Sequence, residues 1–207
     1  MTRPCDILVV GAGGHGKVVI AALREAGHRI AGVFDDNPAM WGQSVLGCTV
    51  LGPSSRLLDL PPAPAVLAMG GNAVRRRLAQ TMPAIEWFTV VHPRACVHSS
   101  VTLGVGTVVC AGAVIQPDAV IGAHCIINTS ASVDHDCQIE DYVHVAPGVH
   151  LAGGVTVKSG TLLGIGACVT PKVTIGSQSI VGAGSVVVRD LPDGITAIGV
   201  PARIQGK

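Results

Sequence analysis

Residues 121–154 read IGAHCIINTSASVDHDCQIEDYVHVAPGVHLAGG, and an aliphatic residue returns in this stretch at every sixth position. The same register runs from residue 91 to residue 192, where the first position of each six-residue block is Val, Leu or Ile. The fifth position is small or β-branched in nearly every block, and Gly, Asn, Asp and Pro gather at the second to fourth positions. Because strand side chains alternate, the fifth residue and the next first residue both point inward, and the residues between them turn a corner.

Three such blocks close one triangular coil of eighteen residues, and stacked coils pair through backbone hydrogen bonds at a spacing of about 4.8 Å. At that spacing, five to six coils make a prism about 27 Å tall. A period of six does not match the 3.6 residues of a helical turn, and the 27 glycines of the chain disfavour long helices. The sequence therefore predicts an all-β parallel β-helix built from hexapeptide repeats.

The outward-pointing sixth position is apolar in several blocks, namely at Val108, Val114, Val120, Ile126, Ile180 and Val186. A monomer would expose this apolar face to water, so we expect other subunits to bury it. A three-sided prism suits threefold symmetry, and we therefore expect a homotrimer.

Residues 1–90 predict a separate α/β domain. A short apolar strand at 7–10 leads into a glycine-rich turn, a helix to about Ala26 and a second strand at about 30–34. The turn, GAGGHGK, consists of Gly11, Ala12, Gly13, Gly14, His15, Gly16 and Lys17. Glycines at the first, third and sixth positions let the backbone approach a phosphate at the N-terminus of a helix. The acidic residues Asp35 and Asp36 follow the second strand, where a carboxylate can accept a hydrogen bond from a ribose or a base.

Further strands are expected at 49–51, 65–68 and 88–90, and together they complete one half of a Rossmann fold. A half-Rossmann domain suits a nucleotide or a diphosphate better than a whole dinucleotide. The strand-end loop 70–72 should face the same crevice, which adds Gly71 to the predicted binding residues. We expect the arginines at 75–77 to form a solvated helix face.

The composition excludes several classes of partner. A net charge of +1 offers no field for nucleic acid or for an anionic membrane. No apolar run approaches the roughly 20 residues that cross a bilayer, and the first residues do not have the form of a signal peptide. The seven cysteines stand singly, which indicates reduced thiols and a cytoplasmic protein.

Four segments together resemble a known family: GAGGHGK, FDDNP at 34–38, the histidine-rich block that ends in LAGG at 151–154, and GVPAR at 199–203. They are similar to the bacterial nucleotide-sugar N-acetyltransferases, hexapeptide-repeat acyltransferases that acetylate 4-amino-4,6-dideoxyhexoses in the bacillosamine and perosamine pathways. The family also includes the sialic acid O-acetyltransferases. The resemblance covers essentially the whole chain. It implies a left-handed parallel β-helix, a homotrimer and acetyl-CoA as co-substrate, and we expect no metal.

The residue that matches the family's general base is His135. A neutral imidazole beside a carboxylate can take a proton from an amine near pH 7. We prefer Asp134 as the orienting carboxylate and place Asp136 second. Residue 153 lies one coil beyond residue 135, so Gly153 should lie about one strand spacing away, where its N–H can stabilise the developing oxyanion.

The remaining residues of the predicted site come from the resemblance. His144 matches a residue near acetyl-CoA or the sugar, and it lies half a coil from His135, so we expect sites shared between subunits. Coenzyme A is then expected in the groove between prisms, against Gly164, Ile165 and Ala183, and Arg203 is expected near the nucleotide phosphates. We assign no role to His98, His124 or His150.

The predicted reaction is direct acetyl transfer from acetyl-CoA to the C4 amine of a nucleotide-linked sugar. No acyl-enzyme is needed, because Cys125 and Cys137 occupy inward positions. A second hypothesis is an O-acetyltransferase for a sialic-acid-type sugar, and a third is a nucleotide sensor on a trimeric scaffold. The sequence leaves open whether the nucleotide is UDP or GDP and which stereoisomer the sugar is.

Overall fold

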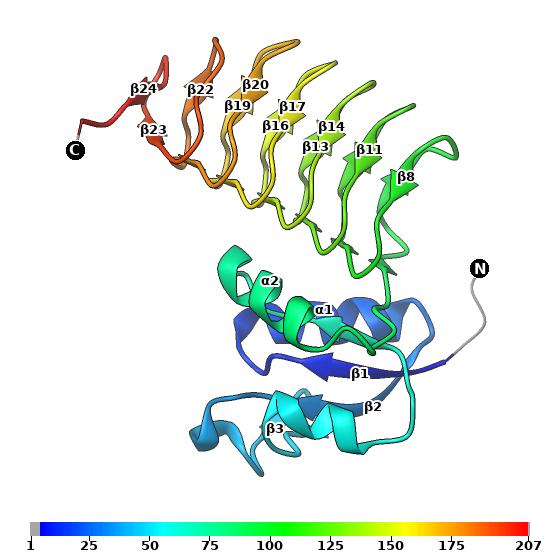
Figure 1. The fold of residues 1–207 in the computed structure, drawn as a ribbon. Coiled ribbons are helices and arrows are strands. Elements are labelled where there is room, and N and C mark those ends of the chain that lie inside the picture. The colour runs from blue at the N-terminus through cyan, green and yellow to red at the C-terminus, as the bar shows by residue number, and fades with distance from the viewer. Residues whose placement is uncertain (1–4, 207) are drawn as a thin grey trace. The chain divides into compact units, whose positions relative to one another are not determined.

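The structure is a computed structural model that describes residues 5–206, and it shows two compact units, of which the first ends at Pro93 and the second begins at Arg94 (Figure 1). The sequence predicts the boundary between them after residue 90. No helix among the described residues is both long enough and apolar enough to cross a bilayer.

The first unit is built on a parallel sheet with strand order β2-β1-β5. Strand β1 (Asp6–Val10) leads into α1 (Gly14–Glu25), β2 is Arg29–Phe34 and β5 is Ala65–Leu67. Parallel bridges from Val33 to Val50 and from Ala65 to Trp87 extend the sheet at both sides. The predicted order of strand, glycine turn, helix and strand is thus confirmed.

The other elements of this unit are short. They are η1 (Pro38–Met40), β3 (Ser44–Val45), β4 (Cys48–Thr49), η2 (Ser54–Asp59), α2 (Asn72–Thr81) and β6 (Val90–Val91). The sequence does not predict the β3–β4 hairpin. Leu46 and Gly47 connect its strands with φ values of 48° and 76°, the positive φ pair that suits a two-residue hairpin turn.

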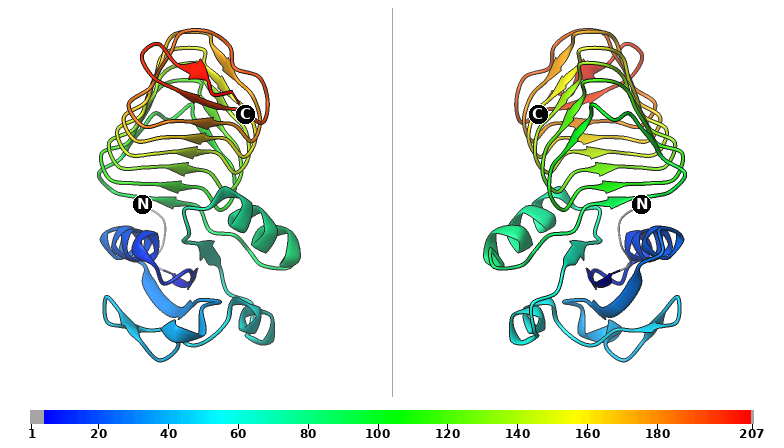
Figure 2. Two further views of the ribbon diagram at one scale, coloured as in Figure 1. Left: turned by 90° about the vertical axis from the view of Figure 1, so that its left-hand side faces the viewer. Right: turned by 90° about the vertical axis from the view of Figure 1, so that its right-hand side faces the viewer.

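The second unit is a parallel β-helix with three faces, and Figure 2 shows its coils stacked one on the next. The first face consists of β7 (Cys96–Val97), β10 (Val114–Ile115), β13 (Ser132–Val133), β16 (His150–Leu151), β19 (Cys168–Val169) and β22 (Val186–Val187). The second face consists of β8 (Thr102–Leu103), β11 (Val120–Ile121), β14 (Gln138–Ile139), β17 (Thr156–Val157) and β20 (Thr174–Ile175). The third face includes β9 (Val108–Val109), β12 (Ile126–Ile127), β15 (His144–Val145), β18 (Leu162–Leu163), β21 (Ile180–Val181), β23 (Thr196–Ile198) and β24 (Arg203–Ile204).

The period of six has a backbone cause. From Gly106 to Gly184, the fourth residue of each block has a positive φ, and these positions alternate irregularly between glycine and residues such as Asp118 and Asp136. A left-handed residue at each corner reverses the chain toward the next face. Paired strands are eighteen residues apart, as in the register of Val114 with Ser132 (132 − 114 = 18), which confirms the triangular coil.

Inward first and fifth positions form one continuous apolar core that includes Val109, Ile127, Val145 and Leu163, all fully buried. Two sixth-position residues depart from the prediction. Val108 and Ile126 are 0% exposed, so residues of the chain itself already cover them. Val120 and Ile180 are 40% and 46% exposed. The apolar face that we expect other subunits to bury is therefore limited to exposed residues such as these two.

The predicted eighteen-residue register is wrong in the last coil. Leu191, expected at a fifth position, instead bridges to Ile175 (191 − 175 = 16), and Ala197 pairs with Val181 (197 − 181 = 16). The corner after Val187 is therefore two residues shorter than the others. The carboxylate of Asp190 accepts a hydrogen bond from the Thr174 N–H at 2.8 Å at this shortened corner.

Candidate active site

His135 lies on the edge of the prism that joins the first face to the second, a corner that we call the His135 edge (residues 134–137 and the equivalent corners 152–155 and 170–173). Its side chain is 61% exposed. Nδ1 of the ring lies 2.7 Å from Oδ2 of Asp136. Because a carboxylate only accepts, Nδ1 carries the proton, which leaves Nε2 with the free lone pair of a base.

The carboxylate on the ring is Asp136, and our preference for Asp134 is wrong. Oδ1 of Asp134 instead accepts a hydrogen bond from the backbone N–H of His135 at 2.8 Å. Asp136 has a φ of 59°. This left-handed backbone turns the chain directly after the histidine, and the Asp136 side chain returns to the ring. The hydrogen bond to Asp136, and then the charges of Asp134 and Asp136, raise the pKa of His135 above its ordinary value despite some desolvation.

Gly153 lies beside the imidazole, as the eighteen-residue coil predicts. A Cβ built at Gly153 would lie 2.5 Å from both Cε1 and Nε2 of His135. The neighbouring Gly154 N–H donates to the His135 carbonyl at 2.9 Å and holds the two coils together. Glycine therefore leaves the space in which Nε2 and the backbone of residue 153 share one surface. Its role at the oxyanion stays a prediction.

His144 begins β15 on the third face, away from the His135 edge of the same chain. Its Nε2 lies 3.1 Å from Nδ2 of Asn128, and Oδ1 of Asn128 accepts from the Thr129 N–H at 2.8 Å. This second bond orients the amide so that Nδ2 donates to the ring. The sequence analysis does not single out Asn128. Its position directly after β12, the strand that pairs with β15, indicates that its side chain lies near His144.

The residues predicted against coenzyme A lie on a different edge, where the third face meets the first; we call it the Ile165 edge (residues 164–167 and 182–185). Ile165 is 63% exposed, and its carbonyl accepts from the Gly184 N–H at 2.8 Å. A Cβ at Gly164 would lie 2.6 Å from the Ala183 nitrogen, so coil packing requires glycine there. Arg203 lies on the exposed strand β24. One chain thus carries the His135 edge and the Ile165 edge apart from each other.

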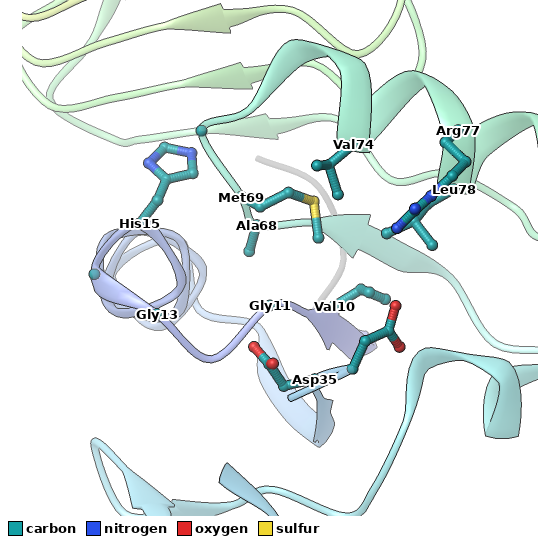
Figure 3. A pocket seen from close by; sticks show the side chains of 13 residues that line it. Val10, Gly11, Gly13, His15, Asp35, Ala68, Met69, Val74, Arg77 and Leu78 are labelled. Atoms are coloured by element: carbon teal, nitrogen blue, oxygen red, sulfur yellow. The ribbon is translucent and has the colours of Figure 1, made fainter. Parts of the chain in front are cut away.

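A pocket of about 340 Å³ lies where the strands of the first unit end (Figure 3). Its lining comes from the glycine turn, from the ends of β2 and β5 and from α2, and it includes the predicted Gly11, Gly13, Gly14, His15, Asp35 and Asp36. The predicted residues Gly16, Lys17 and Gly71 do not line it. Gly16 packs against the turn, since a Cβ there would lie 2.3 Å from the Gly11 carbonyl oxygen, and Gly71 is the N-cap of α2. Gly70 takes the place that we predicted for Gly71.

The two aspartates of this pocket hold the protein's own backbone. Oδ2 of Asp35 accepts from the Ala12 N–H at 2.7 Å, and Oδ1 accepts from the Asn37 N–H at 2.8 Å. Asp35 therefore supports the glycine turn. Oδ1 of Asp36 accepts from the Ser54 N–H at 2.8 Å and from its hydroxyl at 2.6 Å, which leaves Oδ2 to accept from a ligand.

His15 lies in the first turn of α1 and lines the pocket at its margin (Figure 3). Burial, and then the positive charge of Arg75, lower the pKa of His15 to about 4. His15 is therefore neutral at pH 7.

The expected solvated face of arginines on α2 is wrong at Arg75. Arg75 is 1% exposed, whereas Arg77 is exposed and lines the pocket together with Val74 and Leu78 of the same helix (Figure 3). The helical period carries a signal for this, because position 75 shares a face with the buried Leu78 and Ala79 at i+3 and i+4.

Neither inward cysteine is suited to attack a thioester. Cys125 and Cys137 are both fully buried, and burial raises the pKa of Cys137. Among residues 5–206, no group of three or more His, Cys, Asp or Glu is placed to hold a metal ion.

The three unassigned histidines have structural contacts. His98 and His150 lie against serine hydroxyls, those of Ser100 at 3.0 Å and Ser132 at 2.8 Å. His124 is buried and stacks on Tyr142 with ring centroids 5.3 Å apart.

Comparisons with known proteins show the family of the chain. Residues 6–82 match the family described as PglD N-terminal domain, and residues 118–153 match bacterial transferase hexapeptide (six repeats). A perosamine N-acetyltransferase from Caulobacter crescentus, solved as a mutant with CoA and GDP-perosamine, is 43% identical with a TM-score of 0.93, over 98% of this chain and 97% of that one. The chain belongs to the hexapeptide-repeat sugar N-acetyltransferases.

Two more members of this family are similar over part or all of the chain. The acetyltransferase domain of PglB from Neisseria gonorrhoeae, solved with acetyl coenzyme A, is 37% identical with a TM-score of 0.92, over 98% of this chain and all of that one (100%). UDP-N-acetylbacillosamine N-acetyltransferase of Bacillus subtilis is 44% identical over 113 residues, which are 51% of each protein. The chain spans about half the length, or less, of the curated relatives that it matches first.

Proposed function

We propose that this chain transfers the acetyl group of acetyl-CoA to the C4 amine of a UDP- or GDP-linked 4-amino-4,6-dideoxyhexose. One observation carries the proposal. The ring of the exposed His135 is held by Asp136, and its Nε2 faces Gly153 one coil away. Gly153 is the only glycine at the third position of a six-residue block between residues 91 and 192. A base and a backbone amide at one surface are what acyl transfer to an amine requires.

The reaction proceeds in a complex of both substrates. The amine nitrogen attacks the thioester carbonyl, and Nε2 of His135 accepts the proton that the nitrogen loses. The N–H of Gly153 stabilises the oxyanion while the new C–N bond forms. The C–S bond then breaks, and the leaving thiolate takes its proton from the imidazolium. Asp136 stabilises that imidazolium throughout.

The nucleotide of the sugar substrate binds in the pocket of the first unit. Its diphosphate lies against the amides of Gly13 and Gly14 at the N-terminus of α1, and Oδ2 of Asp36 accepts from the ribose or the base. The relatives that were solved with CoA, GDP-perosamine or acetyl coenzyme A support this class of substrates. We further propose a cytoplasmic homotrimer in which the His135 edge of one subunit meets the Ile165 edge of another.

Release of coenzyme A measured over a panel of UDP- and GDP-linked 4-amino sugars tests the proposal. His135→Ala should lower kcat by about 10²–10⁴-fold, because it removes the base. His98→Ala is the matched control, an exposed histidine on the same edge two coils earlier, and it should keep wild-type turnover. Turnover only with a sialic-acid-type sugar would replace N-acetylation by O-acetylation. Ligand binding without any turnover would indicate a sensor.

A further inference from the structure

Arg75 is the largest fully buried side chain among the described residues. It lies in the first turn of α2 and is 1% exposed. Its fixed charge cannot be neutralised by losing a proton, so the cost of burial has to be offset by hydrogen bonds and by nearby negative charge. A buried positive charge next to a pocket also favours an anionic ligand inside that pocket.

The guanidinium spreads its hydrogen bonds over the segment that leads from β5 into α2. Nη1 donates to the carbonyls of Met69 at 3.1 Å and Gly70 at 2.9 Å, and Nη2 donates to Oδ1 of Asn72 at 2.9 Å. Met69 and Gly70 both line the pocket. Because Arg75 binds the carbonyl oxygens of these two residues, the oxygens point toward the guanidinium and do not repel an anion on the other side of the segment.

This segment touches the glycine turn. A Cβ at Gly11 would lie 2.7 Å from the Ala68 carbonyl oxygen and 3.4 Å from Cε of Met69. The chain from 68 to 70 is therefore the pocket wall next to the turn, and Arg75 holds that wall through the carbonyls of Met69 and Gly70. The positive charge also reaches His15 on the far side, where it contributes to keeping that histidine neutral.

We propose that Arg75 is a positioning residue for the diphosphate of the sugar nucleotide: it holds the Met69–Gly70 wall in place and supplies a poorly screened positive charge behind it. The proposal rests on the proposed function. Charges in a protein interior interact several-fold more strongly than in water, so a charge that never touches the diphosphate still favours its binding. Arg77, which faces the same pocket from solvent, is screened more strongly.

The test is calorimetric titration of the wild type and of variants with GDP, UDP, guanosine and uridine. Arg75→Met should lower the affinity for whichever diphosphate the wild type binds by about tenfold or more, because the charge is lost. The affinity for the matching nucleoside should change much less. Arg75→Lys keeps the charge without the planar fork, so it should retain most of the preference for the diphosphate over the nucleoside. Arg76→Met, the next residue of α2 and not part of the pocket lining, is the control.

Kinetics adds a second readout. Arg75→Lys should raise KM for the sugar nucleotide and leave both kcat and KM for acetyl-CoA near the wild-type values. If Arg75 has only a structural role, the diphosphate and nucleoside affinities will fall together in Arg75→Met, and the proposal is then wrong. A wild type that binds GDP or UDP while Arg75→Met binds it equally well also overturns the role of Arg75 but spares the proposed function. A wild type that binds neither diphosphate overturns both. Should Arg75→Met not fold, Arg75→Gln replaces it, because glutamine also removes the charge but keeps hydrogen-bond donors, and the same comparison of diphosphate with nucleoside affinity decides.

Discussion

Asp134 and Asp136 flank His135 in sequence, yet only Asp136 reaches the ring. The pattern of residue types cannot distinguish the two. What distinguishes them is the positive φ of Asp136, which follows from its place as the fourth residue of a block. A sequence argument that includes this corner rule would have chosen Asp136.

Asp136→Asn should move the pH profile of turnover. The hydrogen bond and the charge of Asp136 raise the pKa of His135, so the base is protonated and inactive up to a higher pH than an ordinary histidine would be. The amide removes the charge and weakens that bond, which lowers the pKa. The acid limb of kcat should therefore shift to lower pH, while kcat on the plateau falls because the ring is oriented less firmly.

The matched control for this change is Asp118→Asn. Asp118 occupies the same corner position one coil earlier (136 − 18 = 118) and also has a positive φ, 62°. Its replacement should leave the pH profile unchanged. An unshifted acid limb in Asp136→Asn would show that this carboxylate does not set the pKa of the catalytic histidine.

Among the elements, neighbouring coils bring Gly153 and His135 together across eighteen residues. Third positions elsewhere carry Ala123, Pro147 and Ile165, so the backbone at this position tolerates side chains. Gly153→Ala should therefore fold, but its Cβ would lie 2.5 Å from two ring atoms, and the imidazole must move. A displacement of about 1 Å can cost about 10²-fold in rate, and we expect a loss of kcat of that order.

Thermal unfolding separates this clash from a backbone effect. Gly153→Ala should lower Tm in the wild-type background and should not lower it further when His135 is already alanine, because the ring is then absent. Wild-type kcat in Gly153→Ala would contradict the close approach of the two coils.

The sequence predicts most coils of the prism, because Val, Leu or Ile at every first position leaves one register. It does not predict the shortened corner after Val187. Leu191 is apolar and falls on the expected fifth position, yet it takes the place beside Ile175 that belongs to a first residue. Both places require an apolar side chain, so residue types alone cannot detect the shift. The sequence likewise places Arg75 in solvent. Its burial depends on the carbonyls of Met69 and Gly70, and residue types alone do not show that the fold brings these to the guanidinium.

For the whole molecule, each chain carries the His135 edge and the Ile165 edge apart, so the proposed site needs two subunits. His135→Ala and Ala183→Trp should each be inactive alone, the second because a large ring fills the edge where coenzyme A is expected. Co-expression should restore about a quarter of wild-type turnover, because one site in four of a random trimer combines an intact His135 edge with an intact Ile165 edge.

Each variant purified by itself and then mixed without subunit exchange is the control, and it should stay inactive. Mixed oligomers that remain inactive would contradict a site shared between subunits, and a monomer by sedimentation would contradict the trimer.

The shortened last corner and the residues after it also decide where the prism stops. An uncovered final coil would present three rows of free backbone groups, each ready to pair with the first coil of another molecule. Here β24 turns back antiparallel on β23, the Ala202 N–H donates to the Val186 carbonyl at 2.7 Å, and the Leu191 N–H donates to the Thr174 carbonyl at 3.0 Å. Chain that no longer follows the repeat thus covers the last strand of each face, which removes the regular edge on which the first coil of a neighbouring molecule could continue the stack.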